Sequence, residues 1–225
     1  MDDDLCVAHV PIFARLSRAQ QEQVAGLARP VTAAPGEALY QQGGPLAPLI
    51  VVHRGLVKLT RVTPDGRERV LQVMEPGDFV GEASLLSGGR PDHSAIAVTE
   101  VTLCTFRHED FGGLLVGHPQ IGFEMLGALS KRLADVQDKL EQTGQEVGSR
   151  VADYLLGLPA EPASGGIRVR LPLPKKDVAS LLGTTPESFS RTLARLVEQD
   201  AIALDGARQV VITDVDALSA LTRPE

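Results

Sequence analysis

The stretch "TTPESFSRTLARL", from Thr184 to Leu196, decides the fold because it predicts one helix with two unlike faces. Phe189, Leu193, Leu196 and Val197 recur at helical spacing and form an apolar side. The other side of the helix is polar. A face that only contacts solvent usually carries lysines and glutamates, whereas this face carries an acidic residue, hydroxyls and arginines close to the start of the helix. Its members are Glu187, Ser188, Ser190, Arg191 and Arg195. Such a face indicates contact with a specific partner.

The segments around this helix predict a winged helix-turn-helix. "KKDVASLL" (175–182) is typical of a short helix that Gly183 ends, and Thr185 and Pro186 suit the cap and first position of the next helix. "AIALDGARQVVIT" (201–213) predicts a hairpin around Asp205-Gly206. Upstream, "EVGSRVADYLLGL" (146–158) predicts a helix, "EPASGG" (161–166) a loop and "IRVRLPL" (167–173) a strand.

The side chains of the polar face suit DNA reading. In a helix-turn-helix, the N-terminal residues of the second helix meet base edges in the major groove. Arg191 can bond guanine at O6 and N7 together, and Glu187 can accept from the cytosine amino group. Ser190 suits a base or a phosphate, and Ser188 and Thr184 suit phosphates. The alternative is that Glu187 and Arg191, four residues apart, form only a surface ion pair.

Charge is distributed unevenly along the 225-residue chain, whose net charge is −7. Between residues 165 and 196, six basic residues face two acidic ones, which leaves +4. Such a local basic patch is compatible with specific DNA binding, and we expect Lys175, Lys176 and Thr184 to hold phosphates. No run of about 18 apolar residues predicts a membrane span. The acidic start "MDDDLC" is unlike a signal peptide, so we expect a cytoplasmic protein.

Residues from about 31 to 107 predict short antiparallel strands. "LIVVHRG", "LVKLTRVTPDGRERVLQV" and "SAIAVTEVTLCTF" are rich in Val, Ile, Leu and Thr and are separated by glycine turns. This pattern favours a small barrel or roll, preceded by a helix at about 17–27. The fold class expected for the whole chain is therefore α+β.

A long helix, at about 121–142, is expected to follow the roll. Its apolar residues are spaced 3, 4, 3 and 4 apart, as in a coiled-coil seam. They are Leu126, Leu129, Leu133, Val136 and Leu140. Packing onto its own roll is one interpretation, and a two-helix homodimer contact is the one we favour. Thr143-Gly144 predicts a break. The expected parts are a sensing roll (1–117), a dimerisation helix (118–143) and a DNA-binding domain (144–225).

Over nearly its whole length the chain resembles the Crp-Fnr superfamily of the cyclic-AMP receptor protein and the fumarate–nitrate reduction regulator. "GDFVGEASLLSGG" (77–89) resembles the ligand cassette of a cyclic-nucleotide-binding-type roll, and "ESFSR" (187–191) the recognition helix. The resemblance implies a homodimeric transcription regulator, not an enzyme, with RNA polymerase as a partner. Glu187, Ser190 and Arg191 match the Fnr side, which reads TTGAT-type palindromes. The stretch 167–196 is most similar to the dissimilatory nitrate respiration regulators, a nitric-oxide-responsive branch associated with haem.

The cassette departs from the pattern of cyclic-AMP binders. Gly81 and Glu82 match, but His93, before Ser94, stands where the resemblance implies an arginine for the cyclic phosphate. Losing that arginine removes the planar fork that neutralises a phosphate. Arg90 is a substitute, although Asp92 opposes it. We therefore expect these residues to line an effector pocket that does not take cyclic AMP.

Other effectors remain open at this point. Cys6 and Cys104 lie outside any CxxC pair, so zinc is not expected, and two cysteines exclude a four-cysteine iron–sulfur cluster. The two form a candidate redox pair, unless both are inert thiols. Haem requires an axial ligand, for which the histidines are candidates: His9, His53, His93, His108 and His118. Activity without a ligand is a further alternative, as is a nucleotide-binding regulatory module of an enzyme that does not bind DNA.

Overall fold

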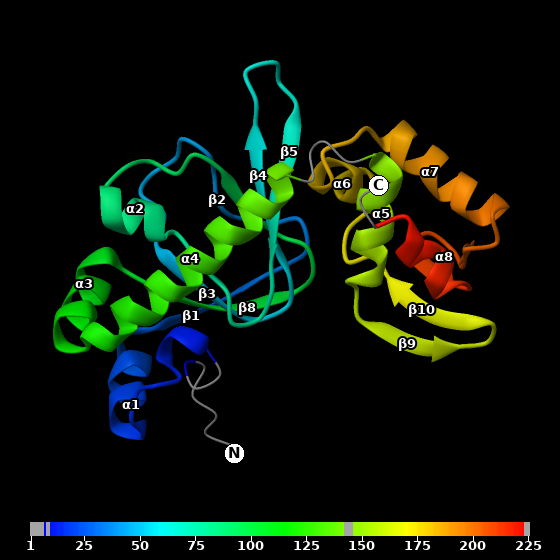
Figure 1. The fold of residues 1–225 in the computed structure, drawn as a ribbon. Helices are drawn as coiled ribbons and strands as arrows, with labels where there is room; N and C mark the ends of the chain where they lie inside the picture. Colours follow the sequence, from blue (N-terminus) through cyan, green and yellow to red (C-terminus); the bar gives the residue numbers. More distant parts are fainter. Residues whose placement is uncertain (1–6, 8–9, 142–145, 223–225) are drawn as a thin grey trace. The chain divides into compact units, whose positions relative to one another are not determined.

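The computed structural model describes residue 7 and residues 10–141 and 146–222, which divide into two compact units, 1–135 and 136–225. Figure 1 shows the first unit as strands with helices around them and the second as a smaller helical unit with its own hairpins. The predicted Cys6, His9 and Thr143-Gly144 lie outside the described residues, as does the side chain of Leu140.

The first unit is an antiparallel roll, which confirms the α+β fold class. Its strands form two four-stranded sheets, in the orders β1-β8-β3-β6 and β2-β7-β4-β5. The strands are β1 (Arg29–Ala33), β2 (Ala38–Tyr40), β3 (Leu49–Arg54), β4 (Val57–Val62), β5 (Glu68–Met74), β6 (Phe79–Val80), β7 (Ser94–Ala97) and β8 (Val101–Phe106). Successive residues of β3 alternate between two cores, since Ile50 packs between the sheets and Val51 packs toward the helices. A strand buried on both faces explains the continuous apolar run "LIVV".

The helices of this unit cover one side of the roll. They are a short η1 (Pro11–Phe13), α1 (Arg18–Leu27), α2 (Glu82–Ser87), α3 (His108–Gly117) and the long α4 (Pro119–Glu141). The predicted helix at 17–27 is confirmed, because Ser17 and Gln20 form a capping box at the start of α1. Helices α2 and α3 were not predicted, because α2 is only six residues long and α3 contains three glycines.

Helix α4 divides the predicted seam between two environments. Leu129 packs against the core of its own roll, beside the buried Ile121 and Met125. Leu126 and Leu133 are each 60% exposed. The residues of the predicted seam are therefore not equally exposed, because Leu129 is partly buried against the roll.

The second unit is a winged helix-turn-helix, as predicted. Its helices are α5 (Val147–Leu156), α6 (Lys175–Leu181), α7 (Pro186–Glu198) and α8 (Val215–Ala220). Its strands, β9 (Ala160–Ala163), β10 (Gly166–Arg170), β11 (Ile202–Leu204) and β12 (Gln209–Ile212), pair in the order β11-β12-β10-β9. The predicted hairpin around Asp205-Gly206 is confirmed.

One predicted loop of this unit is wrong. Part of "EPASGG" is the edge strand β9, which pairs Pro162 with Ile167 of β10. Gly165 and Gly166, with φ of +84° and +154°, form the tight connection. An edge strand accepts the proline because the side without a neighbour needs no amide donor.

Candidate nucleic-acid interface and effector pocket

The turn between α6 and α7 is built from local backbone needs. Gly183 adopts φ +64°, which a side chain disfavours, and the Thr184 amide donates to the Ala179 carbonyl at 2.9 Å. The Thr185 hydroxyl accepts from the Ser188 amide at 3.2 Å, and Pro186 occupies the first turn. These contacts confirm the predicted start of the recognition helix.

The two faces of α7 are largely as predicted. Phe189 and Leu193 are buried, which anchors the helix on its domain. Val197 was assigned to the apolar side, but it is 37% exposed, and Thr192 lies inside instead. The reason is geometric, since Thr192 precedes Leu193 on the edge of the buried stripe, while Val197 lies on the opposite edge.

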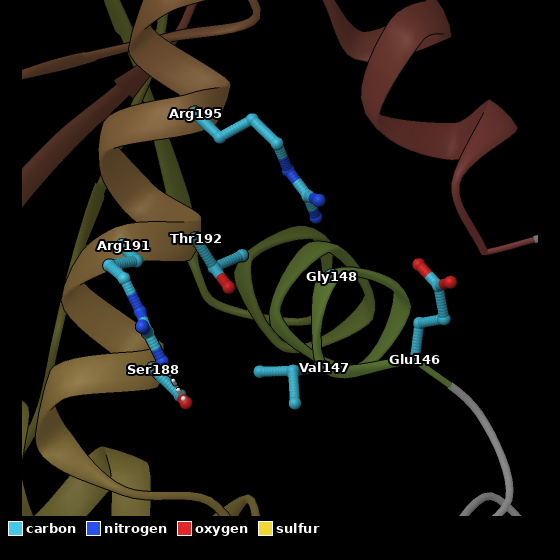
Figure 2. A pocket seen from close by; sticks show the side chains of 7 residues that line it. All are labelled: Glu146, Val147, Gly148, Ser188, Arg191, Thr192 and Arg195. Carbon is cyan, nitrogen blue, oxygen red and sulfur yellow. Dashed lines mark hydrogen bonds between the residues drawn. The ribbon is translucent and has the colours of Figure 1, made fainter.

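The polar face of α7 is exposed and lacks internal ion pairs among the described residues. Glu187, Ser190 and Arg195 are exposed, and Ser188 is half-buried. Arg191 is also exposed and donates from Nη2 to the Ser188 hydroxyl at 3.1 Å, as Figure 2 shows. The Glu187–Arg191 surface pair that was the alternative interpretation does not form within the described residues.

The basic residues before α7 begin α6. Lys176 is exposed, and Lys175 and Thr184 are half-buried. Arg168 differs, because it forms an ion pair with Asp205 at 3.5 Å across β10 and the neighbouring hairpin. The local positive charge that remains available therefore lies on α6, on α7 and at Arg170, the exposed last residue of β10.

In the roll, three of the five predicted effector residues, Gly81, Arg90 and His93, line a pocket of about 200 Å³ beside α2, whereas Glu82 and Ser94 are not part of its lining. His93 is hydrogen-bonded through Nε2 to the Tyr40 hydroxyl at 2.6 Å and through Nδ1 to Asp92 at 2.7 Å. Arg61 pairs with the same Asp92 carboxylate. Burial, with the charges of Glu82 and Asp92 acting in the same direction, raises the pKa of Tyr40 well above its usual range. The tyrosine thus stays neutral and His93 is held on both sides.

The other cassette residues also have partners within the protein. Arg90 donates to the Gly43 carbonyl at 3.1 Å, and the Ser94 hydroxyl accepts from the Gln42 amide at 2.9 Å. Gly81, with φ +97°, lies where a Cβ would be 2.1 Å from the Pro48 carbonyl oxygen, so a side chain does not fit.

Glu82 faces α4. Its Oε1 lies 3.3 Å from Arg132 Nη1, and Arg132 also donates to the Phe79 carbonyl and stacks on the Phe79 ring at 4.5 Å. Glu82 Oε2 is buried without a partner among the described residues. Sequence reasoning missed Arg132, which lies on α4 and is 50 positions from Glu82 in the chain.

Two observations bear on a cyclic nucleotide in the cassette and on haem in the hollow beside α4. At the cyclic-phosphate position stands His93 beside the Asp92 carboxylate, and a carboxylate repels a phosphate. A larger hollow of about 540 Å³ beside α4 is lined, among the described residues, by no histidine, cysteine or methionine that would ligate haem iron. No cluster of three metal-ligating side chains occurs in the parts that the structure describes.

The candidate haem ligands make protein contacts instead. His108 Nε2 bonds the Ala47 carbonyl at 2.7 Å, and His118 Nδ1 lies 3.3 Å from Gln20. His53 is half-buried on β3. Cys104 is 1% exposed within β8, inside the apolar cluster that also contains Val7.

A roll with a ligand cassette, a long helix and a winged helix-turn-helix with an exposed polar face together define a DNA-binding regulator. Comparisons with known proteins agree, since residues 30–118 match the cyclic nucleotide-binding domain and residues 149–221 the Crp-like helix-turn-helix domain. The chain belongs to the Crp/Fnr family, and it is a transcription regulator with a DNA-binding helix-turn-helix.

Three relatives illustrate the match. The chain is 32% identical to a probable transcriptional regulator, flp, of Lacticaseibacillus casei over 94% of this chain and 95% of that protein. It is 30% identical to the CRP-like cAMP-activated global transcriptional regulator of Mycobacterium tuberculosis H37Rv over 87% of this chain and 88% of the other. The solved structure of FixK2 from Bradyrhizobium japonicum shares the fold, with a TM-score of 0.73 and 24% identity over 88% of this chain and 98% of that one.

These relatives are transcription regulators and not enzymes, which agrees with the expectation for this chain. Among the described helices, none is both long and apolar enough to cross a membrane.

Proposed function

We propose that the protein is a homodimeric regulator that reads a TTGAT-like palindrome. The observation that supports this most directly is the exposed face of α7, where Glu187, Ser190 and Arg191 form no ion pairs with one another. Base edges in the major groove would supply the missing partners. The test is a binding titration on a TTGAT palindrome and on duplexes with single base changes. Equal affinity for all of them would contradict sequence-specific reading.

The homodimer is supported by apolar side chains that α4 leaves in water. Phe123 is 74% exposed, Leu126 and Leu133 are 60% exposed each, and Val136 is 51% exposed. Exposed large apolar groups on one helix are typical of a protein–protein contact. A symmetric dimer would place two recognition helices on two half-sites one DNA turn apart.

The dimer is tested with Leu126→Asp, which places a charge in that surface. Because Leu126 touches little of its own roll, the variant should stay folded, sediment as a monomer and lose affinity for the palindrome. Ala134→Asp, at another exposed position of α4, is the control, which should remain dimeric. A dimeric Leu126→Asp variant would show that α4 is not the interface.

For the input at the roll, we propose oxidation of Cys6 and Cys104 to a disulfide. The support is that Val7, which follows Cys6, shares the buried cluster of Cys104. An oxidant of the disulfide class takes two electrons and two protons from the thiols, and a dithiol returns them. The DNA titration is repeated reduced, oxidised and re-reduced. A reversible change of affinity that Cys6→Ser removes is expected, and equal binding in all three states would contradict it.

A contact with RNA polymerase and an alternative function remain to be stated. Contact with RNA polymerase is part of the proposal, because a DNA-bound regulator acts on transcription through it. The alternative function, a nucleotide-binding regulatory module of an enzyme, requires tight nucleotide binding and no DNA binding by the full chain. That pair of results would replace the proposed function.

A further inference from the structure

The side chain of Arg150 joins α5 to the turn between α6 and α7. Its Nη1 donates to the Leu182 carbonyl oxygen at 2.8 Å, although the two residues are 32 positions apart. Leu182 is the residue at which α6 ends, and the last carbonyls of a helix have no amide donor within it. An arginine close to the C-terminus of a helix can supply that donor. Both residues belong to the second unit, so the contact lies within one compact domain.

The backbone beside this contact leaves room for the arginine. A Cβ built on Gly183, the next residue of the turn, would lie 3.3 Å from Arg150 Nη1, which is tighter than most contacts of that kind. The φ of Gly183 is +64°, so a side chain would also be strained there. The guanidinium therefore lies directly against the backbone of the turn, with no side chain between them.

Two backbone bonds hold the same turn to α6. The Gly183 amide donates to the Ser180 carbonyl at 3.0 Å, and the Thr184 amide donates to the Ala179 carbonyl at 2.9 Å. Both bonds stay within the motif that α6 and α7 form. The bond from Arg150 comes from α5 instead, and it therefore fixes the turn relative to a helix outside the motif.

Packing alone does not explain an arginine at position 150. Its Nε is buried without a hydrogen-bond partner among the described residues. A buried donor without a partner destabilises a fold, and an apolar side chain of similar length would avoid that loss. A residue that is unfavourable for stability is typical of a functional position, where the geometry serves another purpose. Here that geometry is the geometry of the turn before the recognition helix.

We propose that Arg150 is a positioning residue for base reading. By holding the Leu182 carbonyl it sets where α7 begins, and α7 carries Arg191 nine positions after Leu182. A specific contact tolerates little displacement, so a residue that holds a recognition side chain in place affects discrimination without touching DNA. Arg150 differs in this from Arg191, which the proposed function places on the DNA itself. The inference rests on that proposed function.

The experiment compares full-length Arg150→Met with the parent protein on the TTGAT palindrome, on palindromes changed at single base pairs and on a scrambled duplex. Methionine fills part of the same space and has no donor. The ratio of the affinities for the palindrome and the scrambled duplex should fall roughly fivefold. The affinity for the scrambled duplex and its salt slope should stay at the parental values, because no phosphate contact is removed. Arg29→Met, at an exposed arginine of the roll, is the control and should change neither.

The melting temperature separates positioning from a structural role. Arg150→Met removes the buried Nε that has no partner, so the variant should melt at the parental temperature or above it while its discrimination falls. Arg150→Lys keeps a charged donor for the Leu182 carbonyl and should regain part of the discrimination. A lower melting temperature with equal losses of affinity on every duplex would overturn the inference, because Arg150 would then be a structural residue only.

A double variant tests whether Arg150 acts through the recognition helix. In the Arg191→Ala background, Arg150→Met should cause little further loss of discrimination at the base pair that Arg191 reads, because the contact that Arg150 positions is already absent. Additive losses at that base pair would contradict the inference. A salt slope lowered by about 0.9 per protomer in Arg150→Met alone would show that Arg150 binds a phosphate, which would overturn it as well.

Failure of this inference and failure of the proposed function give different results. If Arg150→Met discriminates between the duplexes as well as the parent protein does, the inference is overturned and sequence reading by α7 stands. If the parent protein itself binds all the duplexes equally, α7 does not read sequence, and both proposals fail.

Discussion

The recognition helix and the effector cassette are both rich in polar side chains, but they use them differently. On α7 the side chains of Glu187, Ser190 and Arg195 are exposed, with no ion pair among the described residues. In the cassette, His93 is bonded on both sides and Arg90 donates to a carbonyl. A site that must bind a ligand keeps polar groups available, whereas groups paired with one another are already satisfied. The contrast agrees with the DNA-binding role of the helix-turn-helix domain.

Of the variants proposed here, Arg191→Ala should have the largest effect, which is a loss of discrimination between base pairs. If the exposed Arg191 guanidinium reads a guanine, its loss costs about 1–3 kcal/mol of discrimination at that base pair. Discrimination at the other positions of the half-site should change little. The measurement compares the affinity of parent and variant for the palindrome and for duplexes changed at each position. A variant that discriminates as well as the parent would show that α7 is docked differently.

Tyr40→Phe should show that the cassette polar groups stabilise the fold. The change leaves His93, whose side chain is 16% exposed, without one of its two partners, which costs about 1–2 kcal/mol of unfolding free energy in urea. Tyr154→Phe is the matched control, because the Tyr154 hydroxyl is buried without a partner and burial raises its pKa to about 12. Tyr154→Phe should leave the unfolding free energy unchanged or raise it. Equal losses of unfolding free energy in both variants would show that the hydrogen bond of Tyr40 to His93 does not stabilise the fold.

Lys176→Ala should have a smaller and less selective effect than Arg191→Ala. Lys176 begins α6 and is exposed, so it suits a phosphate rather than a base. All duplexes should bind a few-fold more weakly, and the salt slope should fall by about 0.9 per protomer. A loss seen only on the palindrome would mean that Lys176 reads sequence.

The sequence predicts most of the fold because periodicity and turn chemistry are local properties. The caps at Thr185 and Pro186, the glycine at 183 and the hairpin at Asp205-Gly206 lie where the pattern places them. Strand β9 was missed because it contains a proline and depends on its pairing with β10. The partial burial of Leu129 against the roll was not foreseen, because the heptad pattern does not show which side of α4 the roll covers.

The sites were predictable only in part, for a similar reason. The polar face of α7 follows from helical spacing alone. The pairing of Glu82 with Arg132 joins residues that are 50 positions apart in the chain. Long-range pairs of this kind require the tertiary structure. The wider lesson is that the types of residue show where a site lies, and their partners show whether it is free to bind.

Asp92→Asn should give the smallest effect on the free energy of unfolding. The pH dependence of this effect tests whether the Asp92 carboxylate interacts with His93 and Arg61. Partial burial acts to raise the pKa of this carboxyl, but the hydrogen bond to His93 and the charge of Arg61 lower it below its ordinary value of 3.8. A lowered pKa means that the ionised form stabilises the fold above that value. This stability is lost as the pH falls below 3.8 toward the lowered value.

The difference in unfolding free energy between the parent and Asp92→Asn should therefore be constant from about pH 5 to 7 and shrink below about pH 4. It should stay under about 1 kcal/mol, because the Asp92 side chain is 64% exposed and solvent screens its ion pairs. Urea titrations at each pH measure it, with Glu100→Gln, at another exposed carboxylate of the roll, as the control. If the effect of Asp92→Asn on the unfolding free energy changes below about pH 4 in the same way as that of Glu100→Gln, then His93 and Arg61 do not stabilise the Asp92 carboxylate. The contrast between the cassette and α7 would then be weaker.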